Sequence, residues 1–422
     1  MQASLYCRYT GGVGIMIDFE KEKIKVAQNI AKIKVVGIGG AGCNTINSMV
    51  EAGYETIEFF AANTDAQSLD NCKADHQIKL GYKLTKGLGS GSDPSIGKKS
   101  AEEDRDRIAE QLQDADIVFL TAGLGGGTGS GALPVIAQEL KERDILCVAV
   151  VTQPFAFEGK RRKDVSDAAL AEIKKHIDTL IVIPNQKLLS VADKNVSLVD
   201  AFGMINNVVG QFVNSVSNII TRPGHINVDF ADIKAIMKNM GGAIMGTGRA
   251  SGENRAEEAT LQAIASPLLD DHSITGARGI LLNITGNKNL GLHEVSQAAS
   301  LLYEQADEEA SIVLGSVIDE SMGDEVAVTI IATGFEQQPE SSLVAEASPE
   351  QSQKIDTQPT DATSMTEDMT PSHTEQRPQT TNPEEIRVRQ AVKNDSTDID
   401  LEDIETPTYL RRLAEKEKTE QS

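Results

Sequence analysis

The segment from Asp116 to Pro134 reads D-I-V-F-L-T-A-G-L-G-G-G-T-G-S-G-A-L-P, and it decides the fold. The apolar run 117–120 predicts a buried strand, and the apolar segment 135–140 predicts a helix. Glycines in the loop between them lack a Cβ, so backbone N–H groups can turn around an anion. A flexible linker is the alternative, but linkers are not bracketed by a strand and a helix. The segment therefore predicts a phosphate-binding loop at the start of a helix.

A second glycine-rich turn lies earlier, in K-I-K-V-V-G-I-G-G-A-G-C-N from Lys32 to Asn44. A strand precedes it, a helix over 44–52 follows, and the next strand, 57–62, runs into Asn63-Thr64-Asp65. Strand, G-x-G-x-x-G turn, helix and a later acid also form the dinucleotide-binding fingerprint. An NAD-dependent Rossmann oxidoreductase is therefore an alternative function. Two phosphate loops on neighbouring strands count against it, because a dehydrogenase has no use for the second.

Further strand–helix units predict an α/β fold with a parallel, Rossmann-like sheet covered by helices on both faces. Strands are expected at 146–152 and 179–184, with a helix from 157 to 176 between them. Ligands bind at the carboxyl ends of such strands. The loops that leave those ends contain Gly39, Asn63, Gly125, Pro154 and Asn185. A further glycine-rich loop, 83–93, does not match the spacing of a Walker A loop, and whether it touches the ligand stays open. A charged helix is expected after it, over 100–112.

The rest of the chain divides by composition. A long apolar helix is expected at 199–220, followed by a helix at 233–239 and a second, smaller α/β domain up to 335. Residues 337–394 are rich in Gln, Pro, Ser, Thr and Glu, which predicts a disordered linker. The predicted divisions are an N-terminal extension 1–31, a nucleotide-binding domain 32–198, a central helix 199–222, a second domain 223–335, a linker 336–399 and a partner-binding peptide with its tail, 400–422.

Composition limits the partners. The chain has 422 residues and a formal net charge of -23, which argues against nucleic acid or an anionic membrane as a direct partner. No apolar run approaches the roughly 20 residues of a membrane span, so direct membrane insertion is not expected. The four cysteines lack zinc-site spacing, which favours free thiols in a reducing cytoplasm.

Several separate motifs together resemble the tubulin/FtsZ superfamily, the tubulin-like GTPases of bacterial cell division. The similarity covers Lys32 to Phe335 and the C-terminal peptide. The motifs, in chain order, are G-I-G-G-A-G-C-N, N-T-D-A, G-G-G-T-G-S-G, P-F-x-F-E-G-K-R-R, I-P-N, D-A-F, N-V-D-F-A-D and D-I-E-T-P-T-Y-L-R-R. The resemblance implies that the first domain binds GTP and that the second supports polymerisation.

The resemblance also implies a set of nucleotide contacts for GTP or GDP with Mg²⁺, whose protein ligands stay unassigned. Phe202 would pack on the guanine. Asn207 would stand where members of the family often have an Asp that hydrogen-bonds the base. An Asn side chain offers fewer acceptors than an Asp, so the effect on affinity for the base is open. The implied GTP-binding residues are Gly39, Gly40, Ala41, Gly42, Cys43, Asn44, Ala122, Gly123, Gly126, Gly127, Thr128, Gly129, Pro154, Glu158, Arg162, Asn185, Phe202 and Asn207.

The loop N-V-D-F-A-D (227–232) is implied to be catalytic in the next subunit of a head-to-tail homopolymer. Asp229 and Asp232, supported by Asn227, would polarise the attacking water. Two alternatives remain: these acids cap the following helix, or the chain is a relative that assembles without turnover, which the presence of both acids disfavours. Filaments would form the division ring at mid-cell in the cytoplasm. Membrane-adaptor and regulatory proteins would bind the C-terminal peptide through Ile404, Pro407, Tyr409, Leu410, Arg411 and Arg412.

Overall fold

The computed structural model describes residues 31–335, apart from 55, 192–195, 223, 268 and 270–273. The expected N-terminal extension up to residue 30, the linker 336–399 and the peptide that contains Tyr409 lie outside the described residues. No helix in the described part of the chain combines the length and the apolar character that a membrane span requires.

Six parallel strands form the first half of the sheet, in the order β3-β2-β1-β4-β5-β6. This is the strand order of a doubly wound nucleotide-binding fold, and it confirms the predicted Rossmann-like sheet. β3 was not expected from the sequence, because it is four residues long and buries only Ile78. The strands are β1 (Ile33–Ile38), β2 (Ile57–Asn63), β3 (His76–Lys79), β4 (Ile117–Gly123), β5 (Leu146–Gln153) and β6 (Thr179–Pro184).

Helices cover both faces of these strands, because successive side chains of a strand point to opposite sides. Val35 packs in the core cluster beneath the first set of helices, and Val36 packs in the cluster beneath the second set. The first set is α1 (Gly39–Glu51), α2 (Ala66–Asp70), α8 (Asn185–Val191), α9 (Leu198–Thr221) and α10 (Phe230–Met237). The second set is α4 (Pro94–Glu103), α5 (Arg105–Leu112), α6 (Thr128–Glu142) and α7 (Lys160–Ile173). The short α3 (Tyr82–Thr85) precedes α4, and η1 (Ala156–Glu158) precedes α7.

Two helices differ from expectation near the glycine-rich loop. The second half of that loop is the first turn of α6, which begins at Thr128 rather than near 135. Gly131 is required by packing against α4, since a Cβ there would lie 2.1 Å from the backbone oxygen of Pro94, and Gly129 by packing against β4, since a Cβ there would lie 2.8 Å from the backbone oxygen of Gly123. In place of the single charged helix expected over 100–112, the structure has two helices, α4 and α5, which meet at Asp104. The carboxylate of Asp104 accepts a hydrogen bond from the backbone nitrogen of Gly81 at 2.7 Å.

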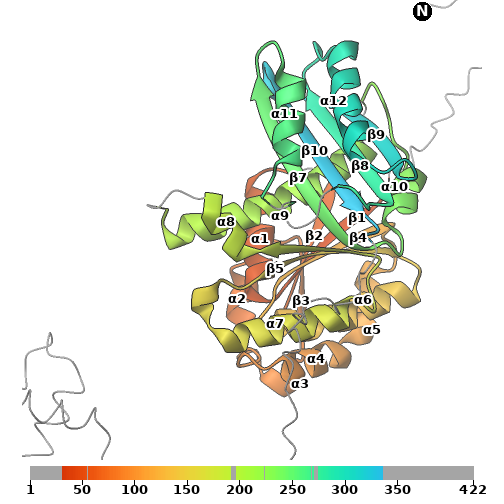
Figure 1. The fold of residues 1–422 in the computed structure, drawn as a ribbon. Coiled ribbons are helices and arrows are strands. Elements are labelled where there is room, and N and C mark those ends of the chain that lie inside the picture. Colours follow the sequence, from red (N-terminus) through yellow and green to blue (C-terminus); the bar gives the residue numbers. More distant parts are fainter. Residues whose placement is uncertain are drawn as a thin grey trace, which may run out of the picture. The chain divides into compact units, whose positions relative to one another are not determined.

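The second half of the molecule adds four strands in the order β7-β10-β8-β9. These are β7 (Gly241–Ser251), β8 (Gly279–Gly286), β9 (Ser311–Ile318) and β10 (Glu325–Thr333), with η2 (Glu320–Met322) between the last two. Figure 1 shows α11 (Arg255–Ile264) and α12 (Leu292–Gln305) covering the outer face of these strands. The two halves share one sheet through a short β6–β7 pairing, and side chains of α9 pack in one core with residues of both halves.

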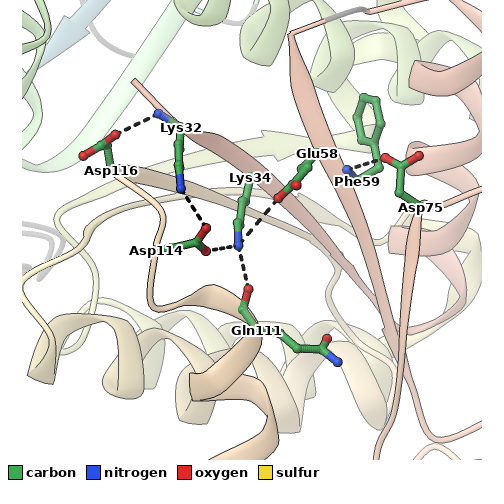
Figure 2. A network of polar contacts seen from close by, with 8 residues as sticks. All are labelled: Lys32, Lys34, Glu58, Phe59, Asp75, Gln111, Asp114 and Asp116. Carbon is green, nitrogen blue, oxygen red and sulfur yellow. Dashed lines mark hydrogen bonds and ion pairs between the residues drawn. The ribbon is translucent and has the colours of Figure 1, made fainter. Parts of the chain in front are cut away.

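A buried lysine supports the end of the sheet opposite the carboxyl ends of the strands. Lys34 on β1 has a side chain that is only 5% exposed, and it pairs with Asp114 and with Glu58 at 3.6 Å. Its ammonium group also donates to the backbone oxygen of Gln111 at 2.7 Å, as Figure 2 shows. Lys32 shares Asp114, and the two lysines hold the pKa of that carboxyl at about 2, well below its usual range. The charge of Lys34 is thus compensated inside the fold.

Candidate nucleotide site and catalytic loop

A cavity of about 460 Å³ lies at the carboxyl ends of β1, β2, β4, β5 and β6. Its lining brings together the loops that the sequence predicted to converge. The lining residues are Ile38, Gly39, Gly40, Ala41, Thr45, Asn63, Thr64, Asp65, Ser68, Gly89, Ser90, Gly91, Ser92, Gly123, Leu124, Gly126, Gly127, Thr128, Gly129, Thr152, Pro154, Glu158, Arg162, Asn185, Phe202, Ile205 and Asn206.

Two helix N-termini point into this cavity. α1 begins at Gly39 and α6 begins at Thr128, and neither start is capped by a side chain. Their first backbone N–H groups therefore lack partners within the helices, and both helix dipoles present their positive ends to the same space. Gly39 is needed between them, because it has a φ of +74° and a Cβ there would lie 3.1 Å from the backbone nitrogen of Gly129. The arrangement suits a polyphosphate.

A cluster of hydroxyl groups forms one wall of the cavity. Thr64 and Thr128 share a hydrogen bond between their hydroxyls at 2.7 Å, and Ser90 reaches Thr128 at 3.1 Å. Ser90 belongs to the loop 83–93, whose contact with the ligand the sequence left open; residues 89–92 line the cavity. A Cβ on Gly127 would lie 2.3 Å from the Ser90 hydroxyl, so this close approach depends on a glycine.

Aromatic and polar groups also line the cavity. Phe202 contacts Phe155 edge to face, with 5.5 Å between ring centroids, and Glu158 pairs with Arg162. Asn185 is buried, and its side-chain oxygen has no hydrogen-bond partner among the described residues. Such an oxygen can accept a hydrogen bond from a bound ligand.

Most of the implied nucleotide contacts line the cavity, and five do not. Gly42 packs against β1 and β4, where a Cβ would lie 2.7 Å from the backbone oxygen of Thr121. Cys43 and Ala122 are buried, Asn44 is exposed, and none of the three lines the cavity. The residues that do line it are Gly39, Gly40, Ala41, Gly123, Gly126, Gly127, Thr128, Gly129, Pro154, Glu158, Arg162, Asn185 and Phe202.

The structure places Asn206, and not Asn207, in the cavity wall. Asn206 accepts a hydrogen bond from the hydroxyl of Thr45 at 3.0 Å, whereas Asn207 is exposed and accepts from Ser48 at 3.4 Å. The helical period would have identified Asn206, because it lies four residues after Phe202 and so on the same face of α9. Sequence reasoning also missed Thr45, Ser68 and Thr152 in the lining.

The loop 224–232 lies beyond the other end of α9. Asp229 caps α10, and its carboxylate accepts from the backbone nitrogen of Asp232 at 2.9 Å. Asn227 accepts from the backbone nitrogen of Gly224 at 2.8 Å. Asn227, Asp229 and Asp232 are all exposed, and none of them lines the cavity. Asp229 therefore has the capping role that the sequence offered as an alternative to catalysis.

Strand β9 anchors this loop through Ser316. The Ser316 hydroxyl accepts from the backbone nitrogen of Ile226 at 2.8 Å, and its own backbone nitrogen donates to the oxygen of Ile226 at 3.1 Å. Gly224 packs so closely on this strand that a Cβ would lie 1.6 Å from the backbone oxygen of Ser316. Arg222 and Asp319 form an ion pair at 3.4 Å beside it. The loop is thus held in one position on the second domain.

Two carboxylates line the cavity, and both are already engaged: Glu158 pairs with Arg162 and accepts from the backbone nitrogen of Phe155. Asp65 lines the cavity, but its oxygens accept from the backbone nitrogen of Gln67 and the hydroxyl of Ser68. Within the described ranges, no group of three or more His, Cys, Asp or Glu side chains could hold a metal by itself.

Comparisons with known proteins agree with this geometry. Residues 32–193 match the model of the GTPase domain of the Tubulin/FtsZ family, and residues 241–336 match that of the FtsZ family C-terminal domain. An empty FtsZ dimer from M. jannaschii is 45% identical, with coverage of 72% of this chain and 88% of that chain and a TM-score of 0.69. A mutant of FtsZ from M. jannaschii is 44% identical over 73% and 92% of the two chains, with the same TM-score. CetZ1 from Haloferax volcanii, a GDP-bound monomer, shares the fold at 23% identity, 73% and 96% coverage and a TM-score of 0.63.

The fold and the site thus define a tubulin-like GTPase, and the oxidoreductase alternative is set aside. Within that class, the chain belongs to the FtsZ family. It binds guanine nucleotide, hydrolyses GTP and assembles into filaments, as membership of this family implies.

Proposed function

We propose that GTP occupies the cavity and that its hydrolysis requires the loop 227–232 of a neighbouring subunit. One observation carries this proposal: the cavity and the loop lie at opposite ends of α9. Phe202 at the cavity and Thr221 before the loop are separated by about 28 Å of helix, at about 1.5 Å per residue. The loop is anchored on β9 through Ser316, so it cannot swing back to its own cavity.

The lining supports one orientation of the nucleotide. The uncapped starts of α1 and α6 would hold the phosphates, together with the hydroxyls of Thr64 and Thr128. Phe202 offers a ring face to the base. The unpartnered oxygen of Asn185 and the side chain of Asn206 would accept hydrogen bonds from the guanine N–H groups. In this proposal Asn206 takes the base-reading role that the resemblance implied for Asn207.

The two acids of the loop would have different roles, one structural and one catalytic. Asp229 is engaged as the helix cap, whereas the carboxylate of Asp232 makes no hydrogen bond or ion pair to any other residue that the structure describes. Asp232 would polarise the attacking water as a general base. Asn227 would hold the loop through Gly224 rather than touch the water. Mg²⁺ bound with the nucleotide would offset the charge of the phosphates.

Exposed apolar side chains near the cavity support docking of a second copy. Leu88 is 87% exposed and Val199 is 80% exposed, and Phe157 and Leu198 are also largely open. Leu88 and Phe157 each adjoin a lining residue in the chain, and Leu198 and Val199 lie in the first turn of α9, the helix that carries Phe202. At the other end of α9, Ile226 in the loop is an exposed apolar residue as well. Different surfaces would meet in this contact, so it is heterologous and extends into an open filament.

These filaments would form the division ring at mid-cell, with the C-terminal peptide binding a membrane adaptor. A direct test measures GTP turnover per molecule against protein concentration. If subunits share a site, turnover stays near zero below a threshold concentration and rises above it, in parallel with pelletable polymer. Turnover that is constant per molecule at all concentrations would contradict the proposal. Deletion of residues 400–422 should leave this threshold unchanged and abolish recruitment to adaptor-coated vesicles.

A further inference from the structure

Two thiols lie in contact directly behind the nucleotide cavity. Cys43 is on the first turns of α1, and Cys72 follows α2; their side chains belong to the same core cluster, and neither forms a disulfide. The sulfur of Cys72 lies 3.7 Å from the backbone oxygen of Cys43. The proposed mechanism uses neither thiol. We propose that Cys43 and Cys72 form a reversible disulfide that controls the nucleotide site, with a peroxide as the oxidant.

The surroundings of Cys72 favour the reactive form of its thiol. The Cys43 thiol donates to the Cys72 sulfur and lowers the pKa of Cys72 to about 7, against the effect of burial, and the backbone nitrogens of Ala74 and Lys73 add to this lowering. The same hydrogen bond, together with burial, raises the pKa of Cys43. Cys72 is therefore the more readily ionised of the two thiols and acts as the nucleophile, while Cys43 keeps its proton until the second step.

The chemistry balances with one peroxide molecule. The Cys72 thiolate attacks one peroxide oxygen, an S–O bond forms, the O–O bond breaks, and hydroxide leaves as water after taking a proton. Cys43 then loses its proton and attacks the sulfur of the Cys72 sulfenic acid; the S–S bond forms and the oxygen leaves as a second water. Each sulfur is oxidised and both peroxide oxygens are reduced. Thiol exchange with an external dithiol reverses the reaction.

One residue connects the thiol pair to the cavity. The amide of Asn63 lines the cavity and donates to the sulfur of Cys43 at 3.8 Å. Cys43 is 2% exposed and Cys72 is 7% exposed, so little of either sulfur faces bulk water. Because Asn63 both lines the cavity and contacts the Cys43 sulfur, we place the entry of a small peroxide on that side. This inference rests on the proposed placement of the nucleotide: a bound nucleotide closes the route and slows oxidation.

Oxidation would in turn disturb the cavity wall. A disulfide draws the Cys43 sulfur toward Cys72 and removes the acceptor of the Asn63 amide. Asn63 also accepts from the backbone nitrogen of Asp65 at 3.3 Å, and Asn63, Thr64 and Asp65 line the cavity together. The oxidised protein should therefore bind nucleotide less tightly, because the wall that these three residues form no longer has its reduced-state geometry.

The test treats the full chain with hydrogen peroxide, with and without saturating GDP, and follows the tryptic peptide 35–73 by mass spectrometry. This peptide contains Cys43 and Cys72 and no internal Lys or Arg. We expect it to lose two hydrogen atoms and to resist alkylation, with GDP slowing the change about tenfold and the oxidised protein binding GTP about tenfold more weakly. Dithiothreitol should restore both properties.

Two variants complete the test. Cys72→Ser should keep normal turnover and become resistant to peroxide, while Cys147→Ser, at a fully buried thiol away from the cavity, should respond like the parent. Three results would overturn the inference. Peptide 35–73 could stay reduced, bound GDP could leave the rate of oxidation unchanged, or peroxide could weaken GTP binding by the Cys72→Ser protein as much as it does for the parent. If the reduced parent binds no guanine nucleotide, the proposed function itself fails, and this outcome is distinguishable from the others.

Discussion

The carboxylate of Asp229 accepts a hydrogen bond from the backbone nitrogen of Asp232, with 2.9 Å between the two atoms. The two acids of the loop are therefore not equivalent. Asp229 stabilises the start of α10, and in doing so it fixes where the carboxylate of Asp232 is presented. The structure thus separates a positioning acid from an acid that is free to act on another molecule.

Substitutions at Asp229 separate capping from charge. Asn caps helices about as well as Asp, so Asp229→Asn should preserve the loop and most of the turnover. Asp229→Ala should destabilise the protein by about 1 kcal/mol and lower turnover further, because the cap is lost. Chemical denaturation and steady-state GTP turnover measure the two effects. Equal loss of turnover in both variants would show that the charge of Asp229, and not the cap, is required.

Adjacent asparagines on α9 provide a matched pair for the base contact. Asn206 lines the cavity and Asn207 does not, so Asn206→Ala should weaken GTP binding by about tenfold or more, the effect of losing about 1.5 kcal/mol of hydrogen bonding. Asn207→Ala should bind GTP nearly as the parent does. Isothermal titration with GDP compares the two. A larger loss at Asn207 would restore the assignment that the family resemblance implied.

Ser316 should matter for catalysis although it lies far from the cavity along the chain. Ser316→Ala removes the acceptor of the Ile226 backbone nitrogen and loosens the loop. We expect turnover per assembled subunit to fall about tenfold while the dissociation constant for GTP stays unchanged. Ser311→Ala, at an exposed position on the same strand, is the control. If Ser316→Ala alters GTP affinity and turnover in parallel, the residue does not act through the loop.

The lysine–aspartate network predicts a pH effect on stability. Asp114 has its pKa lowered from 3.8 to about 2 by Lys34 and Lys32. A lowered pKa in the folded state stabilises the protein above pH 3.8, and this contribution disappears as pH falls through about 2. The parent should therefore exceed Asp114→Asn in free energy of unfolding at pH 5, and the difference should shrink toward pH 2. A difference that is constant over this range would contradict the network.

Much of the fold could be predicted from hydrophobic periods and glycine spacing. The longer parallel strands and the long helix α9 are strongly patterned, so their local signals suffice. β3 was missed because a four-residue edge strand with one buried position has almost no pattern. The early start of α6 was missed because glycine disfavours helices, and only the close packing of Gly131 against Pro94 explains it.

The candidate site was predictable where it consists of backbone and less so where it depends on side-chain direction. Glycine loops at strand ends identify a phosphate site without knowledge of packing. The helical period selects Asn206 over Asn207 only once Phe202 is known to face the cavity, and that rotation of α9 is determined by its contacts with both halves of the sheet. The contact of Cys43 with Cys72 joins residues far apart in the sequence, and no local pattern reveals it.

Trans-complementation tests the shared site most directly. Asp232→Ala keeps the cavity and loses the proposed catalytic acid. Gly127→Asp keeps the loop and blocks the cavity, because its Cβ would lie 2.3 Å from the Ser90 hydroxyl and 2.7 Å from the backbone nitrogen of Asp93. Each protein alone should hydrolyse GTP at least about 100-fold more slowly than the parent. Glu258→Ala, an exposed acid in the first turn of α11, controls for loss of one negative charge.

The decisive measurement is the GTP turnover of the equimolar mixture of Asp232→Ala and Gly127→Asp, with polymer quantified by pelleting in the same sample. A site shared between subunits predicts that the mixture regains a substantial part of the parental rate, because the Gly127→Asp subunit supplies its Asp232 to the intact cavity of its neighbour. Two results would contradict the shared site. The mixture could co-assemble and still hydrolyse GTP no faster than the sum of its components, or the Asp232→Ala protein alone could hydrolyse GTP at the parental rate.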